Sequence, residues 1–191
     1  ADGEFLRIDA THDGDLLRAA VVGLGALGIV VEVTLQCVPA FMLHAVDAPA
    51  PLDETLATLD ERADAADHLE FYWHPHPGVA LTKSQNRLPE AARRQPIPLG
   101  RRWLDERVLS NGVFGAFCAA SRVVPAIIPP FNRLAVRITG DAEYTDVSHR
   151  VLIHRREVRF REMEYALPAE HLVPAFQELR RLIANRRWRI E

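Results

Sequence analysis

The sequence predicts an α+β protein in which helices pack on an antiparallel sheet. Two pairs of strand-like segments follow each other directly, 68–73 with 79–83 and 148–153 with 157–166. Consecutive strands of this kind argue against a doubly wound parallel sheet. Of the 191 residues, 48% are apolar and 26% are charged, a balance that suits one sizeable globular core.

The N-terminal segment is predicted to form a strand, a helix and a second strand. Residues 4–9 suggest the first strand, 11–15 carry helix-capping side chains, and 16–21 continue as a short helix. Residues 29–38 are rich in β-branched side chains, which favours a strand that stops at Pro39.

The middle of the chain is predicted to begin the sheet. Residues 41–46 form a strand, and the prolines of 48–51 make a stiff connection. Leucines at helical spacing and outward acidic residues predict an amphipathic helix over 53–67. The strand 68–73 follows, and 79–83 pairs back with it.

A long apolar stretch occupies the third quarter of the chain. It follows a loop rich in proline and arginine at 86–99 and runs from 103 to 128. Charged residues and a proline interrupt this stretch, so it contains no uninterrupted membrane span. We expect one or two buried helices that end at Pro129 and Pro130, with a membrane-surface element as the alternative.

The C-terminal part is predicted to hold a hairpin, a helix and the start of a strand. The hairpin is formed by 148–153 and 157–166, and the last strand begins at 188–191. Pro168 opens the helix, whose apolar face comprises Leu172, Phe176, Leu179 and Ile183. The chain has no initiator Met and no signal-peptide pattern, and we expect it to be part of a longer polypeptide.

The net charge and the cysteines limit the possible binding partners and the cellular compartment. The net charge of −3 offers no basic face for nucleic acid. Cys37 and Cys118 lie far apart in apolar stretches, which favours free thiols over a disulfide. A reducing compartment, and hence a cytoplasmic location, fits this pattern.

The glycine motif Gly23-x-Gly25-x-x-Gly28 matches the letters of the dinucleotide fingerprint. That fingerprint requires a strand before the glycines and a helix after them, because the helix N-terminus holds the pyrophosphate. Here the predicted order is helix, glycines, strand, so we reject the Rossmann interpretation. Two interpretations stay open: a tight turn that binds nothing, or bare backbone against which a cofactor lies.

The segment 23–39 resembles the last strand and loop of the FAD domain in vanillyl-alcohol-oxidase-type flavoproteins, and more narrowly in sugar-1,4-lactone oxidases. Segments 67–76, 80–83 and 161–168 are similar to that family's substrate domain, in the same order. The resemblance implies that 1–40 is the end of the FAD-binding domain. It further implies that 41–191 is the substrate domain, truncated at its end, with a sugar lactone or polyol as substrate.

The resemblance also implies the cofactor contacts. FAD is expected to lie against main-chain atoms of Gly23, Gly25, Gly28, Ile29 and Val30. The family's N-terminal flavin segment, its Glu-x-Arg strand and its His-Trp-Gly-Lys stretch are not in this sequence. We therefore expect the chain alone to hold no FAD and to be inactive without the remaining segments of the same polypeptide.

The resemblance also implies the substrate-proximal candidates, Glu162 first and Tyr165 second, because the position that matches Glu162 in related enzymes lies toward the substrate cavity. Glu162 and Glu164 alternate on a predicted strand and would share a face, while Tyr165 points to the other. Paired carboxylates can do acid–base chemistry. Exposed strand charges beside arginines remain the alternative.

Other polar groups are weaker candidates. His74 and His76 could ligate a metal, but no third ligand stands at suitable spacing, so we predict no metal site. The next candidates would contact a polyol or an anion, or lie in a solvated loop: Lys83, Asn86 and Arg87. The last group of candidates consists of four arginines, which would contact lipid head groups or form a salt-bridged surface loop: Arg93, Arg94, Arg101 and Arg102.

Two functional classes remain open from the sequence. The first is a piece of a flavoenzyme that oxidises a sugar lactone or polyol by hydride transfer. The second is a non-enzymatic module that binds a partner protein or a membrane and uses the glycine loop only as a turn.

Overall fold

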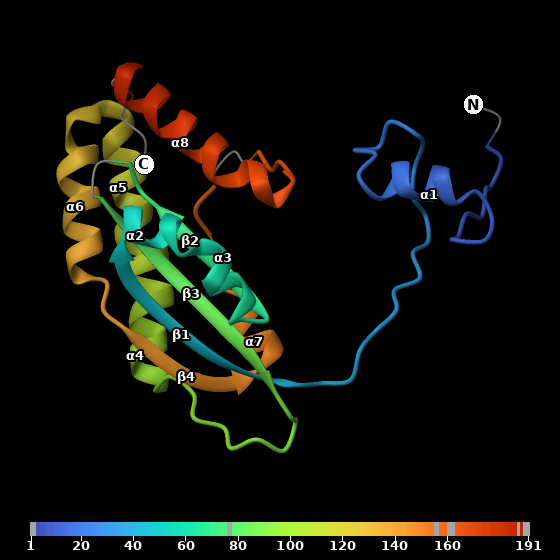
Figure 1. Ribbon diagram of the computed structural model, residues 1–191, viewed down its shortest axis with the longest axis horizontal. Coiled ribbons are helices and arrows are strands. Elements are labelled where there is room, and N and C mark those ends of the chain that lie inside the picture. Colours follow the sequence, from blue (N-terminus) through green and yellow to red (C-terminus); the bar gives the residue numbers. More distant parts are fainter. Residues whose placement is uncertain (1–2, 76–77, 155–156, 160–162, 187, 189–191) are drawn as a thin grey trace. The chain divides into compact units, whose positions relative to one another are not determined.

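The computed structural model describes residues 3–75, 78–154, 157–159, 163–186 and 188 (Figure 1). It divides into two compact units, Ala1–Pro39 and Ala40–Glu191. Each unit has its own architecture.

The first unit contains the helix α1, Gly14–Val21, which confirms the predicted helix. In the turn before this helix, the carboxylate of Asp9 accepts hydrogen bonds from the backbone N–H groups of Thr11 and His12. The predicted strands 4–9 and 29–38 are not formed, and no described residue of this unit is buried. A strand depends on a neighbouring strand for its backbone hydrogen bonds, and the described residues place none beside these segments.

The second unit is built on a four-stranded antiparallel sheet with strand order β2-β3-β1-β4. Its strands are β1 (Met42–Pro51), β2 (His68–Trp73), β3 (Val79–Leu88) and β4 (Ala142–Val147). The predicted hairpin of β2 and β3 is confirmed, with Trp73 opposite Ala80. The strand β4 was not predicted.

Strand β1 continues through the prolines that were predicted to form a connection. Residues 42–47 pair with both β3 and β4, whereas 48–51 pair, among the described residues, with β3 alone. Pro49 and Pro51 therefore occupy a stretch of the strand that is open on one side. Proline is tolerated there because no ladder hydrogen bond is needed on the open side.

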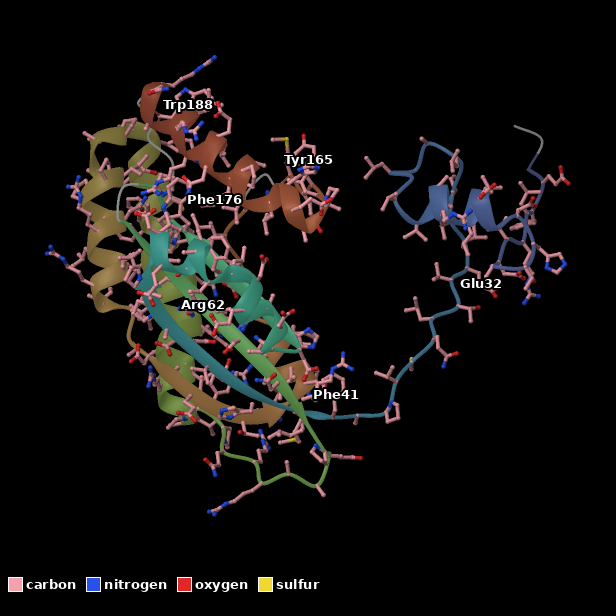
Figure 2. All side chains as sticks on the ribbon, viewed as in Figure 1. Glu32, Phe41, Arg62, Tyr165, Phe176 and Trp188 are labelled. Carbon is pink, nitrogen blue, oxygen red and sulfur yellow. The ribbon has the colours of Figure 1, made fainter. Side chains whose placement is uncertain are left out.

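Helices from both ends of the second unit cover one face of the sheet. The predicted helix 53–67 forms as α2 (Leu52–Ala57) and α3 (Leu59–Asp64), interrupted at Thr58. Leu52 and Leu56 pack on Ala80, with Phe176 at the margin of the same cluster. Phe176 belongs to α8 (Ala169–Arg186), the predicted C-terminal helix (Figure 2).

The long apolar stretch forms consecutive helices: α4 (Leu99–Trp103), the π-helix η1 (Leu104–Val113), α5 (Phe114–Val123), η2 (Pro125–Ile127) and α6 (Ile128–Ile138). Phe117 of α5 is buried and stacks on Phe131 of α6 at 3.6 Å between ring centroids. We predicted that Pro129 and Pro130 end the helices. Instead, both prolines lie in the first turn of α6. First-turn N–H groups have no partner within a helix, so proline costs little there. Among the described residues, no helix has the length and apolarity to span a bilayer.

The prediction of a strand over 148–153 is wrong. The segment forms the short helix α7, Ser148–Leu152. The helical turn places Val151 in a buried cluster with Leu43, Ala45 and Tyr144. Of the predicted strand 157–166, the described residues 157–159 and 163–166 form no strand. The rest of that segment, and all of 188–191 except Trp188, lie outside the described residues.

Candidate functional site

The glycine loop begins where α1 ends. The N–H of Gly23 donates to the carbonyl of Ala20 at 3.2 Å. A Cβ atom at position 23 would lie 3.0 Å from the carbonyl oxygen of Ala19, a contact so tight that the backbone of α1 would have to shift by a few tenths of an ångström. The close return of the chain over its own helix therefore favours glycine at position 23.

Gly25 and Gly28 are required by conformation instead. Their φ angles are +79° and +137°, which side chains rarely adopt. No described atom lies within 4 Å of a Cβ built at either position. The side chain of Ile29 is 91% exposed, and that of Val30 is exposed as well. The loop thus presents main chain without side chains at Gly25 and Gly28, and exposed apolar side chains between and after these glycines.

The order of elements confirms that this is not a Rossmann loop. The glycines follow α1, and the described chain after them is extended until β1. No helix of the described residues begins between Val22 and Pro51. The positive end of a helix, which holds the pyrophosphate in that fold, is not supplied here.

Of the two substrate-proximal candidates, the structure describes only Tyr165. Glu162 lies outside the described residues. Tyr165 is 77% exposed, and its hydroxyl lies 3.9 Å from the sulfur of Met163 (Figure 2). Because the predicted strand is not formed around it, the alternation of faces that we expected for Glu164 and Tyr165 is not observed.

The other polar candidates take structural positions. Within the described part of the chain, no group of three His, Cys, Asp or Glu side chains could hold a metal, and His76 is outside it. Lys83, Asn86 and Arg87 lie on β3 and not in a loop, which corrects the prediction. Asn86 accepts a hydrogen bond from the N–H of Asp67 at 3.1 Å.

Three of the four candidate arginines between 93 and 102 lie beside acidic partners. Arg94 pairs with Asp146, Arg101 with Asp105, and Arg102 with Glu106. These contacts support the interpretation as a salt-bridged surface rather than a lipid-binding patch.

A row of charged side chains crosses the sheet on the face opposite α2. Glu70, Lys83 and Asp47 are direct cross-strand neighbours on β2, β3 and β1, and such neighbours share a face. We call these three residues the polar row. Lys83 was a candidate from the sequence, whereas Glu70 and Asp47 were not, because their proximity to Lys83 depends on strand register.

Burial changes the acidity of groups near this row. Burial raises the pKa of Asp47, and the charge of Lys83 offsets part of that rise. Partial burial, and then the charge of Lys83, lower the pKa of His154, which follows α7. Burial and the charge of Asp47 raise the pKa of Tyr144 to about 12. The imidazole and the phenol are therefore uncharged at neutral pH.

A half-open cavity of about 760 Å³ adjoins the polar row at Glu70, the member of the row that lines it. Its wall comprises residues of β2, of β3 and of the segment after α7, including Glu70, Tyr72, Gln85 and His154. Cavities of this size that carry a few convergent polar groups are the usual place for a small ligand.

Comparison with known proteins identifies the family. A family model described as D-arabinono-1,4-lactone oxidase matches residues 33–191. The chain belongs to this family. The resemblance to sugar-1,4-lactone oxidases is thereby confirmed. The polar row, the cavity and Tyr165 lie within the residues matched to the D-arabinono-1,4-lactone oxidase family, and the glycine loop precedes them.

Individual relatives carry related names. The chain is 38% identical over 186 residues to an L-gulono-1,4-lactone dehydrogenase of Mycobacterium tuberculosis, covering 97% of the chain and 42% of the relative. It is 26% identical over 187 residues to the L-gulonolactone oxidase of Bos taurus, covering 96% of the chain and 41% of the relative. A D-arabinono-1,4-lactone oxidase of Yarrowia lipolytica is 30% identical over 96 residues, or 49% of the chain and 18% of the relative. The chain thus spans about two fifths of the length of the gulonolactone relatives.

Proposed function

We propose that this chain is part of an FAD-dependent oxidoreductase that oxidises a sugar 1,4-lactone or a related polyol. Membership of the D-arabinono-1,4-lactone oxidase family supports this proposal. So do the relatives that are named gulonolactone oxidase or dehydrogenase. Because the chain covers 42% of one such relative, the activity is assigned to the longer polypeptide. The same membership disfavours a non-enzymatic module.

The glycine loop is the observation that carries the cofactor assignment. Gly25 and Gly28 leave amide groups uncovered by side chains, and Ile29 and Val30 add exposed apolar surface. A flavin nucleotide has polar edges and flat apolar faces, so it needs both kinds of contact. The residues present therefore fit the group, with contact through main-chain atoms of Gly23 to Val30.

This assignment gives the cofactor and the candidate residues separate roles. When bound, FAD supplies the acceptor for a hydride from the substrate carbon. Gly23 holds the chain close over α1, so that the loop keeps one shape. Glu162 and Tyr165 are proposed to approach the substrate from the second unit.

The domain assignment is part of the same proposal. Residues 1–40 form the end of the FAD-binding domain, and 41–191 belong to the substrate domain. The division of the structure after Pro39 supports this boundary. The large apolar side chains of the first unit are exposed, which supports cover by other segments of the same polypeptide.

The cofactor assignment is tested on the full-length protein. We expect the purified protein to show the flavin absorption bands, and Gly25→Val and Gly28→Val to lower the ratio of flavin to protein. Gly140→Val is the matched control, because a Cβ there also meets open space and its φ lies outside the positive range. Equal flavin content in all four proteins, with unchanged circular dichroism, would overturn the assignment.

The activity is tested by turnover. The flavin-loaded protein is offered gulono- and arabinono-1,4-lactones and neutral polyols, with oxygen or an artificial electron acceptor. We expect bleaching of the flavin bands by at least one lactone under anaerobic conditions. A yellow protein that no lactone or polyol reduces would contradict the substrate class.

A further inference from the structure

Lys83 is the only lysine of the chain, whereas 22 arginines make up the other basic residues. Arginine serves as the cation in the surface ion pairs described above. A lysine differs from it by a compact ammonium group with three donors that suits a small site. Its side chain is only 22% exposed. A general need for positive charge therefore does not explain the lysine at this position.

The surroundings of Lys83 are acidic and aromatic. Its ammonium nitrogen lies 3.9 Å from Oδ2 of Asp47 and 5.5 Å from the centre of the Tyr72 ring. Glu70 faces it from β2 and accepts a hydrogen bond from the Tyr72 hydroxyl at 3.1 Å. The polar row thus holds its charges in fixed positions on three neighbouring strands.

The hydrogen bonds of this face are incomplete. The distance between Lys83 and Asp47 is too long for a hydrogen bond. Oδ1 of Asp47 and Nε2 of His68 are buried and have no hydrogen-bond partner among the described residues. Nearly all buried polar atoms in folded proteins are satisfied, so these atoms indicate that water or a ligand completes the site.

The charges indicate what kind of ligand fits. The polar row has two carboxylates and one ammonium, so it disfavours an anion. Glu70, Gln85 and His154 line the cavity and offer acceptors and donors together. A compound with several hydroxyl groups can donate and accept at each of them, and a sugar lactone or polyol carries no charge.

We propose that the polar row and its adjoining cavity bind the hydroxyl groups of a neutral polyhydroxylated substrate. Glu70 accepts a hydrogen bond from one hydroxyl, and Lys83 donates to a neighbouring oxygen. This subsite selects the substrate and takes no part in electron transfer. It rests on the proposed function, since it identifies where that substrate's hydroxyl groups are recognised.

Kinetics of the full-length protein test the subsite. We expect Glu70→Gln and Lys83→Met to raise KM at least tenfold for the best lactone, with flavin content unchanged. Lys83→Arg keeps the charge, and we expect it not to restore KM, because guanidinium is larger and planar. Glu143→Gln is the control, because Glu143 is an exposed carboxylate on the opposite face of the sheet. An unchanged KM in both Glu70→Gln and Lys83→Met would overturn the proposal.

A chemical footprint tests the same subsite without turnover. Surface amines of the full-length protein are acetylated, and the peptide that contains Lys83 is quantified by mass spectrometry. We expect saturating lactone or polyol to slow acetylation of Lys83 several-fold, and the corresponding aldonate anion to protect it less. If no neutral polyhydroxylated compound protects Lys83, the subsite is wrong. Failure of the proposed function would appear separately, as a wild-type protein without flavin or without lactone oxidation.

Discussion

The guanidinium of Arg94 and the carboxylate of Asp146 form a two-point ion pair. Nε lies 2.5 Å from Oδ1, and Nη2 lies 3.1 Å from Oδ2. Burial alone would raise the pKa of Asp146, but the hydrogen bonds from Arg94 and from the N–H of Val147 outweigh it and hold that pKa below its usual value. The pair fastens the loop after β3 to β4, beside the bridge between Gln95 and Thr145.

Arg94→Met is predicted to destabilise the protein in a pH-dependent way. In the wild type, the lowered pKa of Asp146 contributes stability above the usual value of 3.8 and loses it as the pH falls through the folded-state pKa. Without Arg94, the carboxylate keeps its burial but loses the two-point partner that stabilises its charged form. The deficit in urea midpoint should therefore be largest at pH 7 and shrink only as the pH falls below 3.8, to about pH 2.5. Arg93→Met is the control, and a deficit that is equal at both pH values would contradict the prediction.

Leu52→Ala is predicted to cost about 2–5 kcal/mol of unfolding free energy. Leu52 is fully buried, at 0% exposure, and packs between α2 and the sheet. Leu99→Ala removes the same atoms from a side chain that is 82% exposed, and it should change stability by less than about 0.5 kcal/mol. Chemical denaturation compares the two. Equal losses would show that the Leu52 cluster is not the core of the second unit.

Elements whose sequence pattern lies within a few neighbouring residues were predicted correctly more often than elements that depend on distant partners. The leucines of α2 and α3 and the hairpin of β2 and β3 are encoded within a few residues, and both predictions are confirmed. The segments 29–38 and 148–153 have strand composition, but strand formation requires a partner that composition does not specify. Val151 shows the outcome, since the helical turn of α7 places it in a buried cluster.

The candidate site shows the same limit. The glycine motif could be recognised in the sequence, and the positive φ angles of Gly25 and Gly28 explain why glycine occupies these positions. The polar row draws Asp47, Glu70 and Lys83 from three strands, and only the register aligns them. One signal in the sequence could have pointed to this site: Lys83 is the single lysine among 23 basic residues. A count that combines lysine with arginine does not reveal it.

His74 is predicted to make the protein sensitive to mild acid. Burial lowers its pKa from the usual 6.5, so the folded state resists protonation while the unfolded state accepts the proton. Stability is therefore lost as the pH falls below about 6.5. Compared between pH 7.5 and 5.5, the urea midpoint of His74→Gln should fall less than that of the wild type. His171→Gln, at an exposed position of α8, should behave like the wild type, and an unchanged acid sensitivity in His74→Gln would refute the assignment.

Phe176→Ala is predicted to release α8 from the sheet. The Phe176 ring makes edge contacts with Phe71 and Trp73, at 5.6 Å and 5.1 Å between centroids. Loss of this anchor should cost on the order of 3 kcal/mol and expose α8 to limited proteolysis. The ion pair of Arg180 with Asp53 also joins α8 to α2, but Asp53 is largely exposed. Arg180→Met should therefore cost less than about 1 kcal/mol. If Arg180→Met loosened α8 more than Phe176→Ala, charge rather than aromatic packing would hold the helix.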